Sequence, residues 1–272
     1  MKIKIANKVF EIHFLFEKEY LPFFASYIVD EDTPDFFVYQ EAYEEDSKKG
    51  DLKISSKRYD MYELSGIDTH YHKSINDETY VGKIVYGDKL IFASKDLHDV
   101  DLNIKLLHYI VTRLLSNSFP CALLKGTVVC YNGSGIFLAS SSSLAYDFAK
   151  LWEKNYDLVY INTHMNFITK ENDKLYVYGN PWCEKDGINN NVIVELNHIV
   201  FFYEDKIVSS RKLESTESFL KLTNHIVTPQ DVKSLEGCNE VLDSIVKLDN
   251  YVLYTKQNKK SIEELKRIID AL

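Results

Sequence analysis

Residues 128–152, VVCYNGSGIFLASSSSLAYDFAKLW, carry the clearest secondary-structure pattern in the chain. Its first part holds two apolar runs, Val128–Tyr131 and Ile136–Ala139, separated by Asn132-Gly133-Ser134-Gly135. This quartet predicts a tight turn between two strands, because asparagine and glycine adopt turn conformations readily. The serine run Ser140–Ser143 follows. The next apolar residues recur at helical spacing: Leu144, Phe148, Leu151 and Trp152. The stretch therefore predicts strand, turn, strand, short loop and amphipathic helix.

Downstream of this stretch, short apolar runs predict further strands. They are Leu158–Ile161, Leu175–Tyr178, Val192–Leu196, Ile199–Tyr203 and Tyr251–Tyr254. Near the end of the chain, Ser261-Ile262-Glu263-Glu264 has the pattern of a capping box, in which a serine and a glutamate bind free backbone N–H groups. We expect the terminal helix to be capped there.

The residues upstream predict a second α/β domain. Its expected strands are Lys2–Ile5, Val9–Phe14, Phe36–Tyr39, Tyr80–Tyr86 and Leu90–Ala93. The charged run Tyr43–Lys49 is typical of a solvated loop. Leucine or isoleucine at 102, 106, 110 and 114 predicts a helix that Asp101 can cap and that ends near Ser118. We therefore predict two domains, residues 1–118 and 119–272.

Composition excludes several classes of partner. The formal net charge is −9, and both nucleic acids and anionic membranes favour a basic face. No stretch approaches the roughly 20 apolar residues that span a bilayer, and the N-terminus lacks the apolar region of a signal peptide. Cys121, Cys130, Cys183 and Cys238 lie far apart, which favours reduced thiols over a zinc site or a disulfide framework. We expect a cytoplasmic protein.

The strand–serines–helix unit has the geometry in which backbone amides and a helix N-terminus bind phosphate. A working phosphate loop also needs glycines, a lysine for the phosphate charge and a hydroxyl for magnesium. Between Ser140 and Asp147 there is neither a glycine nor a lysine, and the first lysine downstream is Lys150. Ser140, Ser141, Ser142, Ser143 and Lys150 are therefore candidates for a vestigial cofactor-binding loop only.

The order of segments from Lys125 onward resembles one branch of the HPr-kinase/phosphoenolpyruvate-carboxykinase-like family. The resemblance covers roughly residues 120–210, and its most specific piece is Gly179-Asn180-Pro181-Trp182-Cys183 with the asparagines that follow at 189–191. It implies an α/β fold: an N-terminal mixed α/β domain plus an HPr-kinase-like C-terminal domain with a mixed sheet and flanking helices. It also implies a substrate cleft at Pro181, Trp182, Cys183, Glu184 and Lys185.

The positions at which this chain differs from the family are those that carry the family's chemical roles. Serines replace the loop glycines, and Lys150 matches no family lysine with certainty. The family carries two acidic residues after the strand that ends at Asn162, used as base and metal contacts, where this chain has Thr163 and His164. Glu184 stands where the family has a glycine, and Lys125 where it often has a histidine. Phosphoryl transfer is mostly positioning and charge neutralisation, so these losses together remove its main contributors.

We therefore predict a non-catalytic relative of the kinase-like phosphotransferases, with no cofactor, that binds or scaffolds a protein or peptide. One alternative is a divergent phosphotransferase using ATP and magnesium, with the serine run as anion cradle and Lys150 or Lys185 as the cation. Another is a hydrolase with Cys183 as nucleophile and His164 as base. The sequence leaves a homo-oligomer open.

Two histidines have the spacing of metal ligands on a strand. His70 and His72 face the same side if Thr69-His70-Tyr71-His72 is a strand. No third ligand is identifiable nearby, so a packed or solvated pair is favoured and no metal site is predicted. Tyr160, Tyr178 and Trp182 are candidates to line the cleft, although aromatic side chains at strand ends are more often core.

Overall fold

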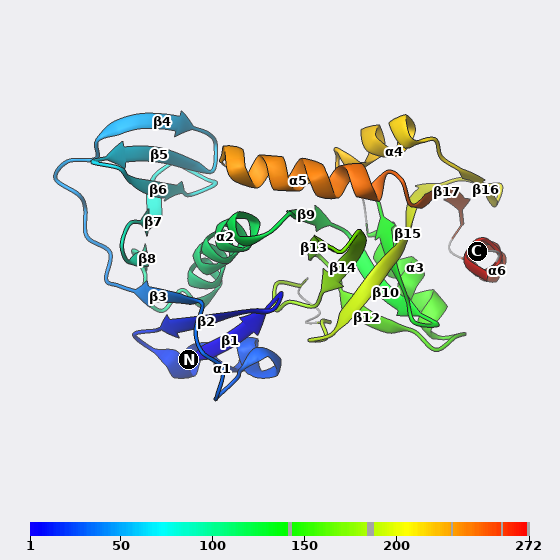
Figure 1. Cartoon of the computed structure of the whole chain (residues 1–272), viewed down its shortest axis with the longest axis horizontal. Coiled ribbons are helices and arrows are strands. Elements are labelled where there is room, and N and C mark those ends of the chain that lie inside the picture. The colour runs from blue at the N-terminus through cyan, green and yellow to red at the C-terminus, as the bar shows by residue number, and fades with distance from the viewer. Residues whose placement is uncertain (141–142, 184–187, 230, 257, 271–272) are drawn as a thin grey trace. The chain divides into compact units, whose positions relative to one another are not determined.

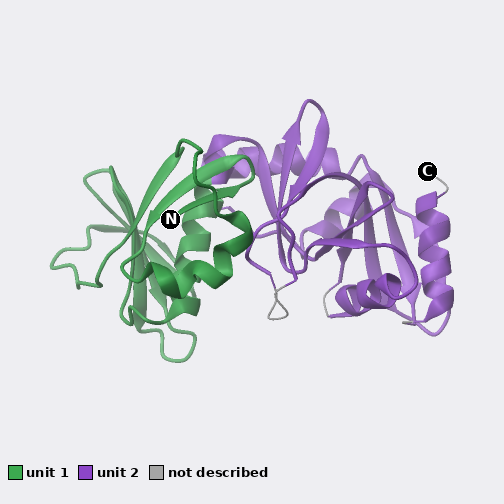
Figure 2. Ribbon diagram, turned by 90° about the horizontal axis from the view of Figure 1, so that it is seen from below, with its two compact units in different colours: residues 1–114 green, residues 115–272 purple. Residues whose placement is uncertain are grey.

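The computed structural model describes residues 1–140, 143–183, 188–229, 231–256 and 258–270. The chain divides into two compact units, Met1–Leu114 and Leu115–Leu272 (Figure 2). Each unit is built on a mixed β-sheet with helices packed on it, which confirms the α/β class expected from the sequence. In the part of the chain that the structure describes, no helix combines the length and the hydropathy needed to cross a membrane.

Unit 1 has a mixed sheet with the strand order β1-β2-β3-β8-β7-β6-β5-β4 (Figure 1). The strands are β1 Lys2–Ile5, β2 Lys8–His13, β3 Phe36–Gln40, β4 Asp51–Ser55, β5 Tyr59–Leu64, β6 Ile67–Lys73, β7 Tyr80–Tyr86 and β8 Leu90–Ser94. The helices are α1 Glu17–Phe24, the short 3₁₀ turn η1 Ala25–Tyr27 and α2 Val100–Ser118, whose last turn crosses the boundary between the units. The strands β2, β3 and β8 run parallel to one another, and the other neighbours are antiparallel.

Helix α2 packs on this sheet through the apolar face that the sequence predicted, with Leu106 and Ile110 fully buried. A Cβ atom on Gly82 would lie 2.9 Å from the Leu106 side chain, so the glycine lets the helix approach β7 closely. Asp99 caps the helix, because its carboxylate accepts a hydrogen bond of 2.9 Å from the Leu102 N–H. The expected cap at Asp101 is wrong, since that residue already lies inside the first turn.

Unit 2 has a central strand, β15 Ile193–Glu204, shared by two groups of strands. Its first residues pair with β14, which continues the order β14-β13-β9, and the rest lies between β11 and β17. The other strands are β9 Cys121–Lys125, β10 Thr127–Tyr131, β11 Ser134–Ala139, β12 Val159–Asn162, β13 Met165–Glu171, β14 Lys174–Tyr178, β16 Ser209–Lys212 and β17 Asp249–Thr255. The helices are α3 Leu144–Glu153, α4 Ser215–Leu222, α5 Val232–Ile245 and α6 Lys259–Asp270.

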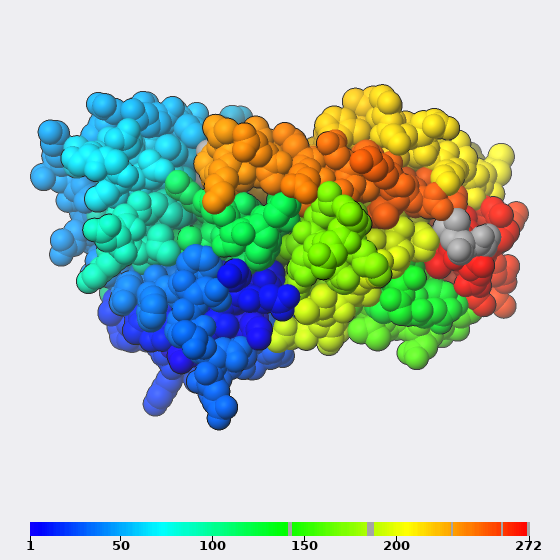
Figure 3. Space-filling view, viewed as in Figure 1, coloured from blue at the N-terminus to red at the C-terminus, as the bar shows by residue number. Residues whose placement is uncertain are grey.

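Alternating side chains of these strands form two apolar layers on opposite faces of the sheet. On β11, Phe137 packs in the layer covered by α5, and Leu138 packs in the layer covered by α3 and α6. The outer sides of α4 and α5, yellow and orange, form part of the surface of this unit (Figure 3). Strands β10 and β11 therefore lie at the centre of unit 2, between its two cores, and α3 covers one of these cores.

Two local expectations for this unit are wrong. The runs 192–196 and 199–203 were expected to be separate strands, but β15 is continuous because His198 pairs with Ile136 on one side and Asp249 on the other. The expected cap at Ser261 is also wrong. Asn258 caps α6, since its side-chain oxygen accepts a hydrogen bond of 3.1 Å from the Ser261 N–H.

Candidate functional site

The candidate site lies at one edge of the unit 2 sheet. Strand β10 pairs antiparallel with both β11 and β12, so β11 and β12 run in the same direction and end at the same edge. Ser140 follows β11 and Thr163 follows β12 at this edge, with β10 between the two strands. Carboxyl ends of parallel strands are where α/β proteins usually bind ligands. The topology therefore brings two of the segments expected at the site to one edge.

The loop before α3 is the position of the vestigial phosphate loop. Ser141 and Ser142 lie outside the described residues, whereas Ser140 is half-buried at the end of β11 and Ser143 is exposed. The Ser143 hydroxyl donates a hydrogen bond of 2.8 Å to the Asp147 carboxylate, in the first turn of α3. A carboxylate there meets the positive end of the helix dipole. An incoming phosphate would meet that negative charge.

Lys150 is the cation that a phosphate site on α3 would need. It is exposed on the last turns of the helix, and its ammonium lies 4.2 Å from the centre of the Tyr146 ring, one turn back. A cation over an aromatic ring gains electrostatic stabilisation from that ring. In this position, Lys150 interacts with its own helix.

The end of β12 is held by Asn162, which is fully buried. Its side-chain amide donates to the Asn180 carbonyl at 2.9 Å and to the Trp182 carbonyl at 3.4 Å, and its oxygen accepts from the His164 N–H at 2.8 Å. This side chain therefore joins the Thr163–His164 segment to the Pro181–Cys183 segment. Buried amides need such partners, so these contacts fix the backbone of both segments.

The sequence resemblance predicted Thr163 and His164 in place of two acidic residues. Thr163 is buried, and its hydroxyl donates a hydrogen bond of 3.4 Å to the Ile188 carbonyl. His164 is half-buried, and its carbonyl accepts a hydrogen bond of 2.9 Å from the Gly126 N–H. Neither position supplies a carboxylate for a metal ion or a catalytic base.

The Pro181–Cys183 segment is packed rather than open. Pro181 and Trp182 are buried, and Trp182 packs edge-on against Phe167 at a ring distance of 6.4 Å. Glu184 and Lys185, the rest of the expected cleft, lie outside the described residues. Tyr160 and Tyr178 are also buried. Of the side chains expected to line a cleft, these aromatic ones belong to the core.

Asparagines of the connection between β14 and β15 bind this segment to its neighbours. Asn180 donates to the Met165 carbonyl at 2.7 Å, and Asn190 donates to the Tyr160 carbonyl at 2.6 Å. Asn189 donates to the Cys183 sulfur at 3.3 Å. An amide N–H cannot accept the thiol proton, so this contact gives Cys183 no general base. The trailing asparagines, predicted first as a turn, bind their own connection at Cys183 and strand β12 at Tyr160.

Sequence reasoning missed the role of Asn180 and Asn166. Asn166 is fully buried and donates to the Gly126 carbonyl at 2.8 Å, across from β13 to the segment between β9 and β10. The only signal was an excess of asparagine around positions 162–191, and asparagine is read first as a turn residue when partners are unknown.

His70 and His72 do face the same side of β6, toward α2 in unit 1. Both are buried, His70 stacks on Tyr59 at 5.2 Å, and the His72 ring lies 4.8 Å from that of Tyr109. In the described part of the chain, no group of three histidine, cysteine or acidic side chains is close enough to hold a metal ion. Burial lowers the pKa of His70 to about 4 and that of His72 to about 3, so both rings are neutral near pH 7.

Comparison with known proteins gives remote similarities to solved structures only. No protein family and no curated protein matches the chain. Among solved structures, the HPr(Ser) kinase/phosphatase from Coxiella burnetii aligns over 55% of this chain and 88% of its own, with 6% identity and a TM-score of 0.34. A TM-score of this size does not establish a shared fold, so membership of the HPr-kinase-like family stays a prediction.

Proposed function

We propose that unit 2 is a non-catalytic relative of the HPr-kinase-like phosphotransferases that acts by binding a protein or peptide. The observation that carries the proposal is the contact between Ser143 and Asp147 at the start of α3. Where a phosphotransferase holds phosphate, this helix presents a carboxylate, and the nearest lysine lies over the ring of Tyr146.

The arrangement of the neighbouring segments supports the same proposal. Phosphoryl transfer needs a metal ion held by oxygen ligands and a base within reach of the acceptor hydroxyl. The resemblance predicts Thr163 and His164 at the corresponding positions, and Thr163 is buried with its hydroxyl directed to a carbonyl. The Asn162 contacts stabilise this edge as a packed structure. A cytoplasmic location and the identity of a partner stay predictions.

Calorimetry with magnesium-ATP tests the proposal on the full chain. A phosphate cradle donates several charge-assisted hydrogen bonds of roughly 1.5–3 kcal/mol each, and losing two or three of them turns a micromolar site into one weaker than millimolar. We expect no heat of binding and no ATP turnover. A dissociation constant below about 100 μM that Lys150→Ala abolishes would refute the proposal and favour the divergent phosphotransferase. Lys154→Ala, just past the end of α3, is the matched control for loss of a lysine.

A further inference from the structure

Three tyrosine rings in unit 1 surround a single ammonium group. The Nζ atom of Lys49 lies 4.2 Å from the centre of the Tyr80 ring, 4.9 Å from that of Tyr71 and 5.8 Å from that of Tyr62. The rings are inclined to one another: Tyr62 and Tyr71 meet at 87°, and Tyr71 and Tyr80 at 44°. Together, Tyr62, Tyr71 and Tyr80 form what we call the tyrosine cage.

The strand register explains why these rings meet. They come from the neighbouring strands β5, β6 and β7, on the face opposite to the one that carries His70 and His72 against α2. Side chains two residues apart share a face, which places Tyr62 with Asp60, and Tyr71 with Lys73. A slip of one residue would turn these side chains toward α2, so the register that buries the histidines also builds the cage.

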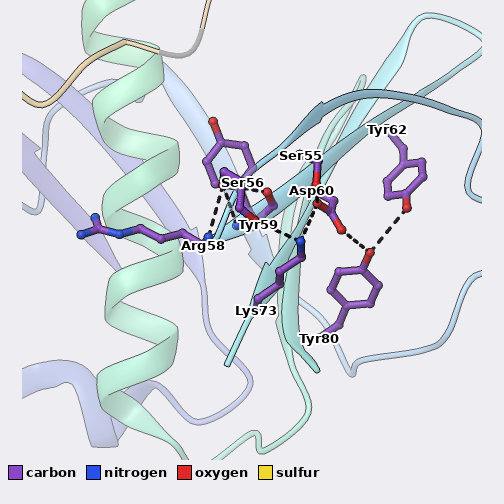
Figure 4. A network of polar contacts seen from close by, with 8 residues as sticks. All are labelled: Ser55, Ser56, Arg58, Tyr59, Asp60, Tyr62, Lys73 and Tyr80. Carbon is purple, nitrogen blue, oxygen red and sulfur yellow. Dashed lines mark hydrogen bonds and ion pairs between the residues drawn. The ribbon is translucent and has the colours of Figure 1, made fainter. Parts of the chain in front are cut away.

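In two of the three tyrosines, the hydroxyl donates a hydrogen bond to a carboxylate. Asp60 accepts hydrogen bonds from the Tyr80 hydroxyl at 2.6 Å, the Lys73 ammonium at 2.7 Å and the Ser55 hydroxyl at 2.7 Å. Figure 4 shows the Asp60 carboxylate between Lys73 and Tyr80, with the Tyr62 hydroxyl turned toward that of Tyr80 at 3.4 Å.

Asp46 does the same for Tyr71, since it accepts a hydrogen bond from that hydroxyl and pairs with Lys83 at 2.9 Å. A phenol that donates to a carboxylate gains electron density, which strengthens the attraction of its ring for a cation. Burial and these carboxylates raise the pKa of Tyr71 and of Tyr80, so both remain neutral phenols near pH 7.

The cage recognises a cation by ring faces and not by an ion pair. Each carboxylate is already paired with a lysine of the sheet, Asp60 with Lys73 and Asp46 with Lys83. Among the described residues, no side-chain hydrogen bond or ion pair joins Lys49 to an acceptor; its ammonium lies over the three rings, and its charge also interacts with the Asp46 carboxylate. Aromatic cages of this kind suit a cation whose charge is spread over methyl groups, because such a cation does not need hydrogen-bond acceptors.

Lys49 reaches the cage from the segment 41–50, which joins β3 to β4 without regular structure. The sequence predicted a solvated loop at Tyr43–Lys49, but Asp46 and Lys49 bind the sheet. Lys49 itself is half-buried, so solvent reaches the occupant.

We propose that the tyrosine cage is a binding site for a methylated ammonium group, and that Lys49 occupies it until such a ligand displaces it. The ligand chemistry is shared by small quaternary amines and by a trimethylated lysine in a peptide. This site lies in unit 1 and is independent of the function proposed for unit 2.

The test uses tetramethylammonium chloride as probe and the ring resonances of Tyr71 and Tyr80 as readout, with ammonium chloride at equal ionic strength as control. Lys49 competes with the probe for three ring contacts, each of which changes the affinity by a factor of about 2–5. The Lys49→Ala variant should therefore bind tetramethylammonium at least about 10-fold more tightly than the wild type does. Lys48→Ala, its exposed neighbour, should bind like the wild type.

Removing a ring tests the cage itself in the Lys49→Ala background. A further Tyr80→Leu change should abolish binding, and Tyr80→Phe, which keeps the ring, should retain most of it. Equal binding by Lys49→Ala and the wild type, or by the Tyr80→Leu and Tyr80→Phe variants, would overturn the proposal. Tyr62→Leu at a half-buried position gives a second ring deletion in case Tyr80→Leu does not fold.

Peptides distinguish the two sources of the ligand. If a peptide with trimethyllysine binds the Lys49→Ala variant at least about 10-fold more tightly than tetramethylammonium does, the ligand of the cage is a methylated peptide. Similar affinities indicate that the ligand is a small quaternary amine. The unmethylated peptide should bind more weakly than its trimethylated form, and equal binding of the two peptides would contradict the proposed specificity.

Discussion

Acidification should destabilise unit 1 through His70 and His72. Both rings are buried between the sheet and α2, and burial is the largest cause of their lowered pKa values, about 4 and about 3. The guanidinium of Arg113, 3.5 Å from the His70 ring nitrogen, further disfavours the charged form of His70, whereas Asp68 opposes it. For His72, the positive charges of protonated His70 and Lys105 act in the same direction as burial.

The sign and size of the change in unfolding free energy with pH follow from the linkage between proton binding and folding. In the unfolded chain each histidine has the ordinary pKa of 6.5, so below that pH the unfolded state binds more protons than the folded one. The contribution of the two histidines to the unfolding free energy is therefore fully present above pH 6.5, and it is lost as the pH falls toward their pKa values in the folded state. Between pH 7.5 and 5.0, the loss is about 2 kcal/mol for each histidine, or about 4 kcal/mol for the pair.

The assay is unfolding in urea at a series of pH values, followed by hydrogen exchange of peptides from β6 and β7. These peptides report on unit 1, whereas tryptophan fluorescence reports on unit 2, where Trp152 and Trp182 both lie. His72→Gln should remove about half of the pH dependence. A wild-type loss below about 1 kcal/mol, or an unchanged slope in His72→Gln, would refute the reasoning.

Further predictions concern unit 2. Gly179→Ala should lower the unfolding free energy of this unit in urea by about 2–3 kcal/mol, because the new Cβ would lie 1.7 Å from the Asn190 carbonyl oxygen. Gly133→Asn, at an open turn with φ of 81°, should lower it by less than about 1 kcal/mol. Equal losses for the two variants would contradict the packing described. Asn162→Ala should cost about 3 kcal/mol by leaving buried backbone groups without partners, and a cost near zero would show that the two loops are held otherwise. Asp147→Asn should strengthen the binding of inorganic phosphate at α3 a few-fold, as measured by phosphorus NMR, and an unchanged affinity would mean that this carboxylate does not exclude anions.

The sequence predicted the fold best where patterns are local. The strands around Asn132 and Gly133 and the helix from Leu144 lie where their apolar spacing indicated, with both turn residues at positive φ. Helix caps were misplaced by a few residues at Asp101 and Ser261, because several polar residues near a helix start can each serve as the cap.

Features that depend on contacts between residues far apart in the chain could largely not be predicted from the sequence. Strand β5 and much of β6 alternate tyrosine, histidine and charged residues, so their hydrophobic pattern is weak, and the cage depends on a register that no single strand reveals. The same holds for Asn162 and Asn180. Their amides bind backbone carbonyls far along the chain, and only the folded topology makes those contacts visible.

The α3 edge of unit 2 should not bind nucleotide, and the stability of unit 2 with and without nucleotide measures this. Both tryptophans report on this unit, so urea unfolding followed by their fluorescence gives its free energy with and without about 1 mM magnesium-ATP. A site weaker than millimolar adds less than about 0.4 kcal/mol, and we predict a change within that bound. A gain of about 1.4 kcal/mol or more, which corresponds to a dissociation constant of about 100 μM or tighter, would contradict the account.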